Sequence, residues 1–573
     1  MLLADRLAQR SRRLRTSWAV AGALFLLLVV ERVSSSAGYT RSAYTTSGLA
    51  LRLSRQSVPK ASFGDDLTFT EYLDAHFPQT ARYPPHLWLT LSDKAFAGTA
   101  IANLDAFVDQ LNSERRVRYG RDTRETRLVV LCIFKDCVEE AERRGLYAYG
   151  GYQRTRPEII FHATWPKLAS FIEILPQRDL FFLDADVAFA LDPYPHMERY
   201  MNEGFDIIAQ ENNGFEHFNT GWMWMRKGQV IADAWQEVLE RDMVTPSRDQ
   251  NNFNEVLDTG PRRLHKEGRP ERRPLLSDFV SKQGLKVHVL DPRLFRAYHH
   301  WNELFVKPHE SLMLHSTCAD DIPVKLFLPK VQGFWMDLDD YYSQPAPILS
   351  VDIMSGTQED LTQLFKVVLA GAYYAGRAVM LPGQSTVMDL ANTTLTPTPI
   401  RLAQQTFPLS QLAMPDSPLG VRVVEPEYVD HAVRHLMGRS TLDSAKRRDD
   451  GWWESLGKAE QVRRLDTVAN ITKIVDIDMR HQTSFGGFVA RLTQEHNFHD
   501  AAHVRLVNTD WPFLQHWRGW TDLPEPVRQI ETCRHIEEMQ TCVHVCRFDD
   551  DVKVIKSEGA WPSVESVIGD EGI

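Results

Sequence analysis

Three triplets in the sequence have aspartates on either side of one apolar residue. Where a strand gives way to a loop, two carboxylates one residue apart can both reach one hard cation, such as Mg²⁺ or Mn²⁺. Such a cation would neutralise charge that develops on a departing diphosphate. An isolated triplet is more often a solvated turn, so context must separate the three. They are Asp184-Ala185-Asp186, Asp337-Leu338-Asp339 and Asp476-Ile477-Asp478.

The first triplet has the most informative context. It directly follows the apolar run Leu180–Leu183 (LFFL), which predicts a short buried strand. In open α/β sheets, ligands bind at the carboxyl ends of the strands, which is where Asp184 and Asp186 would lie. The triplet that begins at Asp476 also follows an apolar stretch and stays a minor alternative.

Two polar clusters follow the first triplet along the chain. Phe218–Arg226 (FNTGWMWMR) places Gly221 directly before an apolar strand, and glycine permits close approach of the backbone to a ligand. Asp249–Asn254 (DQNNFN) begins a helix with an acid and amides. A simple turn and ordinary helix capping explain each cluster when it is taken alone. The order of the three motifs therefore carries more information than any one of them.

The elements around these motifs alternate between strands and helices. Helical spacing over Phe96–Leu111 predicts one helix, and a second runs from a cap at Thr164 to a stop at Pro176. Such alternation predicts an α/β domain with a largely parallel sheet. The predicted strands are His86–Leu91, Arg127–Phe134 and Leu180–Leu183.

The series Trp165-x-Lys167, LFFLDADVAFALDP, FNTGWMWMR and DQNNFN, in this order, resembles the nucleotide-diphospho-sugar transferase family. That family includes xylosyl-, arabinosyl- and galactosyltransferases of plants, algae and slime moulds. The resemblance covers about residues 80 to 340. It implies a GT-A fold, dependence on Mn²⁺ or Mg²⁺, and transfer from a UDP-sugar with retention of anomeric configuration.

The resemblance also implies the metal ligands. Asp184 and Asp186 would hold the metal and the donor diphosphate, and His315 would be the third ligand. A lone histidine at a strand end is more often structural, and three nearby histidines stay open as alternatives: His299, His300 and His309. The chain departs from the family at Ala319-Asp320-Asp321, where a glycine is expected, although Lys325 and Gly333-Phe334-Trp335 remain.

The donor pocket follows from the same resemblance. Thr90 would lie near the nucleotide base, and Lys167 would face the donor. Possible catalytic groups on the sugar side are Gln210, Glu211 and Asp249. The residues expected to shape the sugar pocket are Asn219, Gly221, Asp249 and Gln250.

The N-terminus predicts a membrane anchor. Five arginines between Arg6 and Arg15 precede the apolar run Trp18–Val30, whose 13 residues are short against the roughly 20 that span a bilayer. The basic leader favours an uncleaved signal-anchor at 17–32, with the tail 1–16 cytoplasmic and a stem at 33–80. A cleaved signal peptide ending near Ser35–Gly38 is the alternative. We therefore expect a single-pass type II protein of the Golgi membrane, with its catalytic part in the lumen.

Two further features agree with a lumenal location. Sequons begin at Asn392 and Asn470, and the six cysteines permit disulfides of unknown connectivity. The three C-terminal cysteines lie near His535 and His544, but their spacing fits no standard zinc module, so a disulfide is favoured. The net charge of −11 argues against a nucleic-acid partner.

A second α/β pattern follows the catalytic domain, which we place at 81–344. Strands are expected at Ile348–Ile353, Val421–Val424 and Ile471–Ile477, and a capped helix runs from Thr357 to Gly376. The segment TQEDLTQLFKVVLAGAYYAGRAVMLP is similar to one in plant cell-wall arabinosyltransferases. The sequence thus predicts a smaller Rossmann-like accessory domain at 345–573.

The predicted activity is transfer of xylose, arabinose or galactose from a UDP-sugar to a hydroxyl of a glycoprotein or polysaccharide. Retention is compatible with a carboxylate nucleophile or with front-face attack, and the resemblance favours the front-face route. Two alternatives stay open. A phosphohydrolase of the haloacid dehalogenase type also places an Asp-x-Asp after an apolar strand, and a non-catalytic lumenal binding protein could share the fold.

Overall fold

The structure is a computed structural model that describes fifteen segments of the chain: residues 59–63, 67–79, 85–119, 124–152, 165–211, 218–244, 249–257, 278–297, 311–317, 322–382, 385–389, 394–398, 419–438, 452–528 and 561–569. The predicted anchor and the sequon at Asn392 lie outside these segments. So do four cysteines and the three alternative histidines: Cys318, Cys533, Cys542, Cys546, His299, His300 and His309. None of the helices within the described segments has the length and apolar character that crossing a membrane requires.

A nine-stranded mixed sheet carries the predicted motifs. The first five strands in spatial order, from β1 to β5, pair in parallel. Strand β8 is antiparallel to its neighbours β5 and β7, and β10 is parallel to β7. The α/β prediction is confirmed. In spatial order the strands are β1 (Ala61–Ser62), β4 (Tyr147–Tyr149), β3 (Thr126–Cys132), β2 (His86–Ser92), β5 (Leu180–Asp184), β8 (Phe218–Met225), β7 (Ile207–Glu211), β10 (Lys286–Leu290) and β9 (Phe279–Val280).

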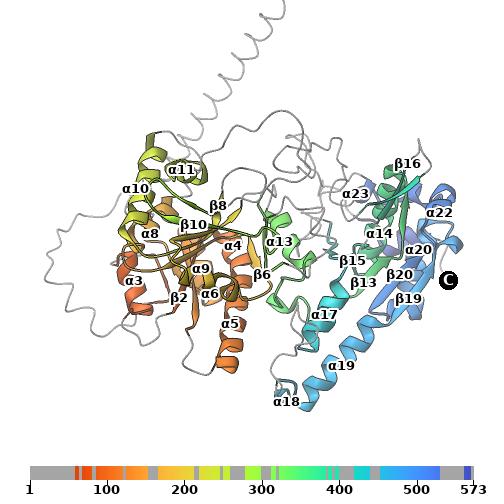
Figure 1. The fold of residues 1–573 in the computed structure, drawn as a ribbon. Helices are drawn as coiled ribbons and strands as arrows, with labels where there is room; N and C mark the ends of the chain where they lie inside the picture. The colour runs from red at the N-terminus through yellow and green to blue at the C-terminus, as the bar shows by residue number, and fades with distance from the viewer. Residues whose placement is uncertain are drawn as a thin grey trace, which may run out of the picture. The chain divides into compact units, whose positions relative to one another are not determined.

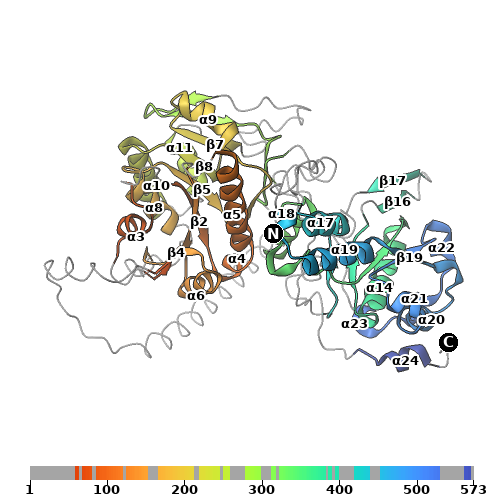
Figure 2. The same ribbon diagram turned by 90° about the horizontal axis from the view of Figure 1, so that it is seen from below.

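Helices cover both faces of this sheet, as Figure 2 shows for α5 on one side and α8 and α10 on the other. The core beneath α5 includes Trp88, Phe181 and Leu183, whereas Phe171 of α8 packs against Phe182 on the opposite face. Neighbouring residues of β5 thus point to opposite faces, as a strand requires. The helices around the sheet are α3 (Phe69–His76), α4 (Lys94–Ala97), α5 (Ala100–Tyr119), α6 (Lys135–Arg144), α8 (Trp165–Ile174), α9 (Tyr194–Asn202), α10 (Gln229–Val244) and α11 (Asp249–Val256).

The predicted helix over Phe96–Leu111 is wrong in one respect, because the structure divides it into α4 and α5. The side chain of Asp93 caps α4 by accepting a hydrogen bond from the backbone N–H of Phe96, and the short helix ends at Gly98. Periodicity alone does not reveal such a break, because the apolar residues on both sides still face the same sheet.

A three-stranded sheet brings the histidine toward the acidic triplet. It contains β11 (Phe295–Ala297), β12 (Met313–His315) and β6 (Val187–Phe189). Strand β12 runs antiparallel to β6, with His315 opposite Val187. The backbone N–H of Ser316 continues the pairing by donating to the carbonyl oxygen of Asp186 at 3.0 Å. This pairing fixes the end of β12 beside the loop that follows β5.

A second sheet of five parallel strands lies in the C-terminal part of the described chain (Figure 1). Helices α14 and α20 pack on its core, and Thr357 and Asp360 form the predicted capping box of α14. In spatial order the strands are β18 (Val423–Val424), β15 (Ala378–Met380), β13 (Ile348–Val351), β20 (His503–Val507) and β19 (Ile474–Asp478); the helices are α14 (Gln358–Tyr374), α17 (Tyr428–Leu436), α19 (Lys458–Thr472) and α20 (Phe485–Gln494).

The C-terminal part of the described chain has the predicted alternation of strands and helices. Ile471 belongs to α19 instead of a strand, and the strand starts only at Ile474. The bounds 345–573 of a separate domain stay a prediction.

One disulfide lies within the described residues. It joins Cys132 at the end of β3 to Cys137 in α6, and both residues are buried. The sequence predicted disulfides without their connectivity, and this pair supplies one connection.

Candidate active site

Asp184, Asp186 and His315 form one cluster. Asp184 ends β5, Asp186 lies in the turn before β6, and His315 ends β12. One ligand atom from each lies within 4.8 Å of those of the other two. The His315 Nε2 atom is 3.2 Å from Asp186 Oδ1 and 3.5 Å from Asp184 Oδ2. The predicted metal-ligand set therefore meets at one point in the fold.

The cluster is open on one side. The side chain of Asp184 is 43% exposed, whereas those of Asp186 and His315 are 6% and 1% exposed. Two carboxylates and an imidazole suit a divalent cation of the Mn²⁺ type, which accepts both oxygen and nitrogen ligands. Three protein ligands leave coordination positions for a substrate, and the exposed Asp184 marks the side from which it would enter.

Gln210 orients the histidine. Its Oε1 atom lies 2.8 Å from His315 Nδ1, and its Nε2 atom donates to the carbonyl oxygen of Phe295 at 3.0 Å. Because the amide oxygen accepts the Nδ1 hydrogen, Nε2 of His315 faces the two carboxylates. The fully buried side chain of Gln210 thus lies behind His315. Its predicted place beside the donor sugar stays a prediction and gains no support from this position.

Positive charges stabilise the ionised acids of the cluster. Burial acts to raise the pKa of Asp186, but His315 and Lys325 outweigh it and hold the pKa well below its usual range. Burial also acts to raise the pKa of Asp184, but the positive charge of Lys167 opposes it, and the pKa of Asp184 is lowered. Burial acts to lower the pKa of His315, but the two carboxylates raise it to about 9. Without a metal, the imidazole is therefore protonated at neutral pH.

Gly221 packs directly against the cluster from β8. A Cβ atom at this position would lie 2.1 Å from Asp184 Oδ2 and 2.5 Å from His315 Cε1, so any side chain would displace a ligand. The backbone N–H of Gly221 donates to Asn219 Oδ1 at 2.6 Å. The close approach in this structure is to the carboxylate of Asp184, and the predicted approach to a bound donor stays a prediction.

A buried ion pair lies beside the metal ligands. Lys167 Nζ is 2.6 Å from Asp249 Oδ2 and donates to the carbonyl oxygen of Thr220 at 3.2 Å. The hydroxyl of Thr220 donates to Asp249 Oδ2 at 3.4 Å, and its backbone N–H donates to Gln250 Oε1 at 3.3 Å. The residues of α8, β8 and α11 that were predicted to bind the sugar donor therefore lie close together. Sequence reasoning missed Thr220, although its place between Asn219 and Gly221 was a signal.

Two more polar groups lie at this end of the sheet. Thr90 pairs with Leu183, one residue before Asp184, and its buried hydroxyl has no hydrogen-bond partner within the described segments. Glu211 is the last residue of β7, and burial with the nearby Asp291 raises its pKa. The role of Thr90 near a nucleotide base stays a prediction.

The acids of the other two triplets bind local partners, and among the described residues neither triplet belongs to a group of three potential metal ligands. Asp337 accepts backbone hydrogen bonds from Tyr342 and Ser343, and Asp339 pairs with Arg144. In the triplet on β19, Asp476 pairs with Arg505 and Asp478 with Arg480. These acids therefore serve local structure.

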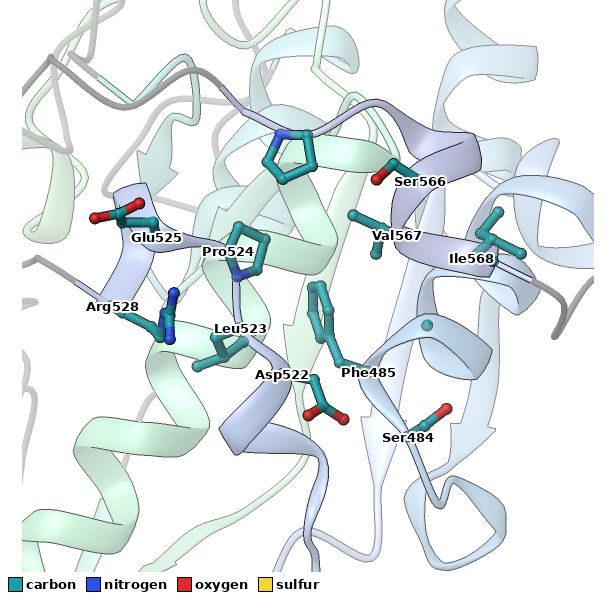
Figure 3. A pocket seen from close by; sticks show the side chains of 13 residues that line it. Ser484, Phe485, Asp522, Leu523, Pro524, Glu525, Arg528, Ser566, Val567 and Ile568 are labelled. Carbon is teal, nitrogen blue, oxygen red and sulfur yellow. The ribbon is translucent and has the colours of Figure 1, made fainter.

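A cavity of 610 Å³ lies apart from the metal ligands, between the start of α20 and helices α23 (Glu525–Arg528) and α24 (Val564–Ile568). Figure 3 shows Phe485, Leu523 and Pro524 in its lining, with Asp522, Glu525 and Arg528 nearby. None of the predicted site residues lines it. We therefore place the chemistry at the Asp184 cluster.

The segment that contains this site matches the model of a protein family. Residues 163–328 match the model of the nucleotide-diphospho-sugar transferase family, a segment that contains Asp184, Asp186 and His315. This segment is therefore similar to that family, which is the resemblance that the sequence motifs predicted. A comparison with curated proteins found no match.

Three similar solved structures are those of glycosyltransferases. The glycosyltransferase GlyE of Streptococcus pneumoniae TIGR4 is 11% identical, with 61% of this chain and 83% of that one covered and a TM-score of 0.25. The galactosyltransferase LgtC, in complex with donor and acceptor sugar analogues, is 13% identical over 41% and 88% of the two chains, with a TM-score of 0.26. Mouse xyloside xylosyltransferase 1 is 15% identical over 42% and 99%, with a TM-score of 0.25.

Proposed function

We propose that this chain is a metal-dependent glycosyltransferase of GT-A type that transfers a sugar from a UDP-sugar to an acceptor hydroxyl. One observation carries the proposal. The cluster of Asp184, Asp186 and His315 lies inside the segment that matches the nucleotide-diphospho-sugar transferase model. Its carboxylates are ionised, and Asp184 is open to solvent.

The residues that would hold Mn²⁺ or Mg²⁺ are Asp184, Asp186 and His315. When bound, the cation supplies positive charge that stabilises the departing nucleoside diphosphate. The chain's own groups prepare the site for it. Gln210 fixes the orientation of the imidazole, and Lys325 Nζ holds Asp186 Oδ2 at 2.7 Å. The Nε2 proton of His315 must leave before this nitrogen can bind a metal.

The arrangement of acids near the cluster favours front-face attack over a covalent intermediate. A carboxylate nucleophile must be ionised and free to reach the anomeric carbon. Asp249 is engaged by Lys167 and Thr220, so it is not free to reach the anomeric carbon. Glu211 lies buried at the end of β7, and burial raises its pKa. A route in which a donor phosphate oxygen accepts the proton of the acceptor hydroxyl needs no such group.

The acceptor and the location form part of the same proposal. A type II protein of the Golgi membrane would meet glycoproteins and polysaccharides as acceptors. The basic residues beside Trp18–Val30 support this location, and so do the Cys132–Cys137 disulfide, which suits an oxidising lumen, and the exposed Asn470. The sugar would be xylose, arabinose or galactose.

A donor screen tests the proposal. The full chain, purified in detergent, is incubated with UDP-xylose, UDP-arabinose or UDP-galactose in Mn²⁺ or in EDTA, and release of UDP is measured. We expect one donor to be turned over only with the metal. Hydrolysis of p-nitrophenyl phosphate without UDP release from any donor would instead support the phosphohydrolase. If the protein binds a UDP-sugar but turns over neither class of substrate, the non-catalytic binding protein is favoured.

A further inference from the structure

Helix α13 (Ile322–Val331) connects the metal site to a second buried polar cluster. Near its start, Lys325 holds Asp186. Lys330 lies in the last turn of the same ten-residue helix, and Pro329 precedes it. A displacement of the end of α13 would therefore be transmitted along the helix to Lys325.

The helix ends in a Schellman motif at Gly333. The N–H of Gly333 donates to the carbonyl of Lys330 at 2.9 Å, and that of Phe334 donates to the carbonyl of Pro329 at 2.7 Å. Gly333 has a φ of +70°, which favours glycine. A Cβ atom there would also lie 2.8 Å from His431 Nε2, so helix α17 packs tightly against this turn.

Glu425 is the centre of the second cluster. It follows β18 directly, and its side chain is 0% exposed. The hydroxyls of Tyr341 and Tyr342 donate to its two carboxylate oxygens at 2.8 and 2.7 Å, and His431 Nδ1 lies 3.4 Å from Oε1. These partners compensate for the burial of the carboxylate.

Lys330 places a positive charge from α13 against this cluster. Its Nζ atom is 4.1 Å from the centre of the Tyr341 ring and 5.0 Å from that of Trp335, which are cation–π distances. Burial lowers the pKa of Lys330 to about 8, and the charge of Glu425 opposes that effect. Tyr341 contacts both charged groups, since its ring faces Lys330 and its hydroxyl donates to Glu425, so the cluster of Glu425 helps to keep the end of α13 in place.

The first α/β region holds the same segment from the other side. Asn103 of α5 accepts the N–H of Met336 at 2.6 Å, and its amide donates to the carbonyl of Phe334 at 3.4 Å. The turn after α13 is thus clamped between α5 and the Glu425 cluster. A change at Glu425 would move one of these two supports.

We propose that Glu425 is a positioning residue for the metal site: with His431 it fixes the end of α13, and through α13 it fixes Lys325 and Asp186. The C-terminal sheet thereby takes part in forming the site. This inference rests on the proposed function, because it concerns the same metal ligands. It gives a role to a cluster that touches neither the cation nor the donor.

The first test removes the charge of Glu425. In the full chain, Glu425→Gln should weaken Mn²⁺ binding about tenfold in calorimetry, which is within the range for a change in a packed network that couples to a distant site. The double variant Glu425→Gln/Lys330→Met removes both charges and should restore the affinity to within about threefold of wild type. Asp476→Asn, an acid-to-amide change in the same sheet whose partner is Arg505, is the control and should leave binding unchanged.

The second test uses two glycines with similar backbone angles. Gly376 also has a positive φ, +62°, but a Cβ atom there would meet nothing within 4 Å. Gly333→Ala and Gly376→Ala should therefore strain the backbone alike, while only Gly333→Ala presses on His431 and disturbs α13. We expect weaker Mn²⁺ binding and faster hydrogen exchange in α13 for Gly333→Ala alone.

Two outcomes separate the inference from the proposed function. Unchanged Mn²⁺ affinity in both Glu425→Gln and Gly333→Ala, even with a lower melting temperature, would show that the cluster supports only the fold and would overturn the inference. If the wild-type protein binds no Mn²⁺, the proposed function itself fails. Because calorimetry with Mn²⁺ alone needs no sugar donor, the two failures are distinguishable.

Discussion

A Cβ atom on Gly221 would lie 2.1 Å from Oδ2 of Asp184, so the metal site and strand β8 require a glycine at this point. We expect Gly221→Ala to displace the carboxylate and to weaken Mn²⁺ binding by about a hundredfold, at the upper end of the range for lost support around a metal. Gly228→Ala is the matched control, because a Cβ atom there meets nothing within 4 Å. Calorimetry on both variants checks this, and equal affinities would contradict the close packing.

Gln210 offers a test between two roles. If it only orients His315, Gln210→Leu should weaken Mn²⁺ binding about tenfold, because the Nδ1 hydrogen of His315 loses its acceptor. If Gln210 acts on the donor sugar, as the sequence predicted, Gln210→Leu should lower kcat at saturating Mn²⁺ and leave metal affinity alone. Metal titrations beside donor kinetics decide between the two.

The pH dependence of stability and of Mn²⁺ affinity should follow from the protonation of His315. Its pKa in the folded, metal-free protein is raised to about 9 from an ordinary 6.5, so its contribution to stability is fully present below pH 6.5 and is lost as pH rises through 9. Mn²⁺ needs the deprotonated nitrogen, so its apparent affinity should rise about tenfold per pH unit below pH 9.

Thermal unfolding with and without Mn²⁺, from pH 6 to 9, checks this directly. The increase in melting temperature on adding Mn²⁺ should grow with pH in the wild type. His315→Ala should show little of this growth. A flat response in the wild type would mean that His315 is not a metal ligand.

The ion pair between Lys167 and Asp249 should matter for stability as well as for the donor. Both side chains are almost fully buried, so Lys167→Met leaves an uncompensated carboxylate and should lower the free energy of unfolding by about 3 kcal/mol. Lys167→Met/Asp249→Asn removes both charges and should recover part of that loss. Urea unfolding of the three proteins measures the effect, and a single variant as stable as wild type would contradict the pairing.

The sequence predicted the parts of the site that are local to one element. The apolar run Leu180–Leu183 predicted a strand, and the end of that strand placed Asp184 and Asp186. The resemblance to a family supplied His315, since nothing in its neighbourhood identifies a lone histidine as a ligand. The strand and its two aspartates were predicted from short-range patterns, which can be recognised without the tertiary structure.

Contacts between distant residues could not be predicted in this way. Lys167 and Asp249 come together only because α8 and α11 approach β8, and Gln210 meets His315 only because β7 ends behind β12. The proposed role of Glu425 depends on the turn after α13, where Gly333 packs against His431. Each contact is set by packing, which pattern and spacing do not encode for a single chain.

Metal-dependent turnover of a sugar nucleotide tests the central claim most directly. UDP release from the donor that the wild type prefers is measured in the full chain and in Asp186→Asn, each in EDTA and then with added Mn²⁺. We predict that Mn²⁺ restores turnover in the wild type and that Asp186→Asn stays at least about a hundredfold slower at the same Mn²⁺ concentration. Equal turnover by the two proteins, or full wild-type turnover in EDTA, would contradict the assignment of this cluster as the catalytic metal site.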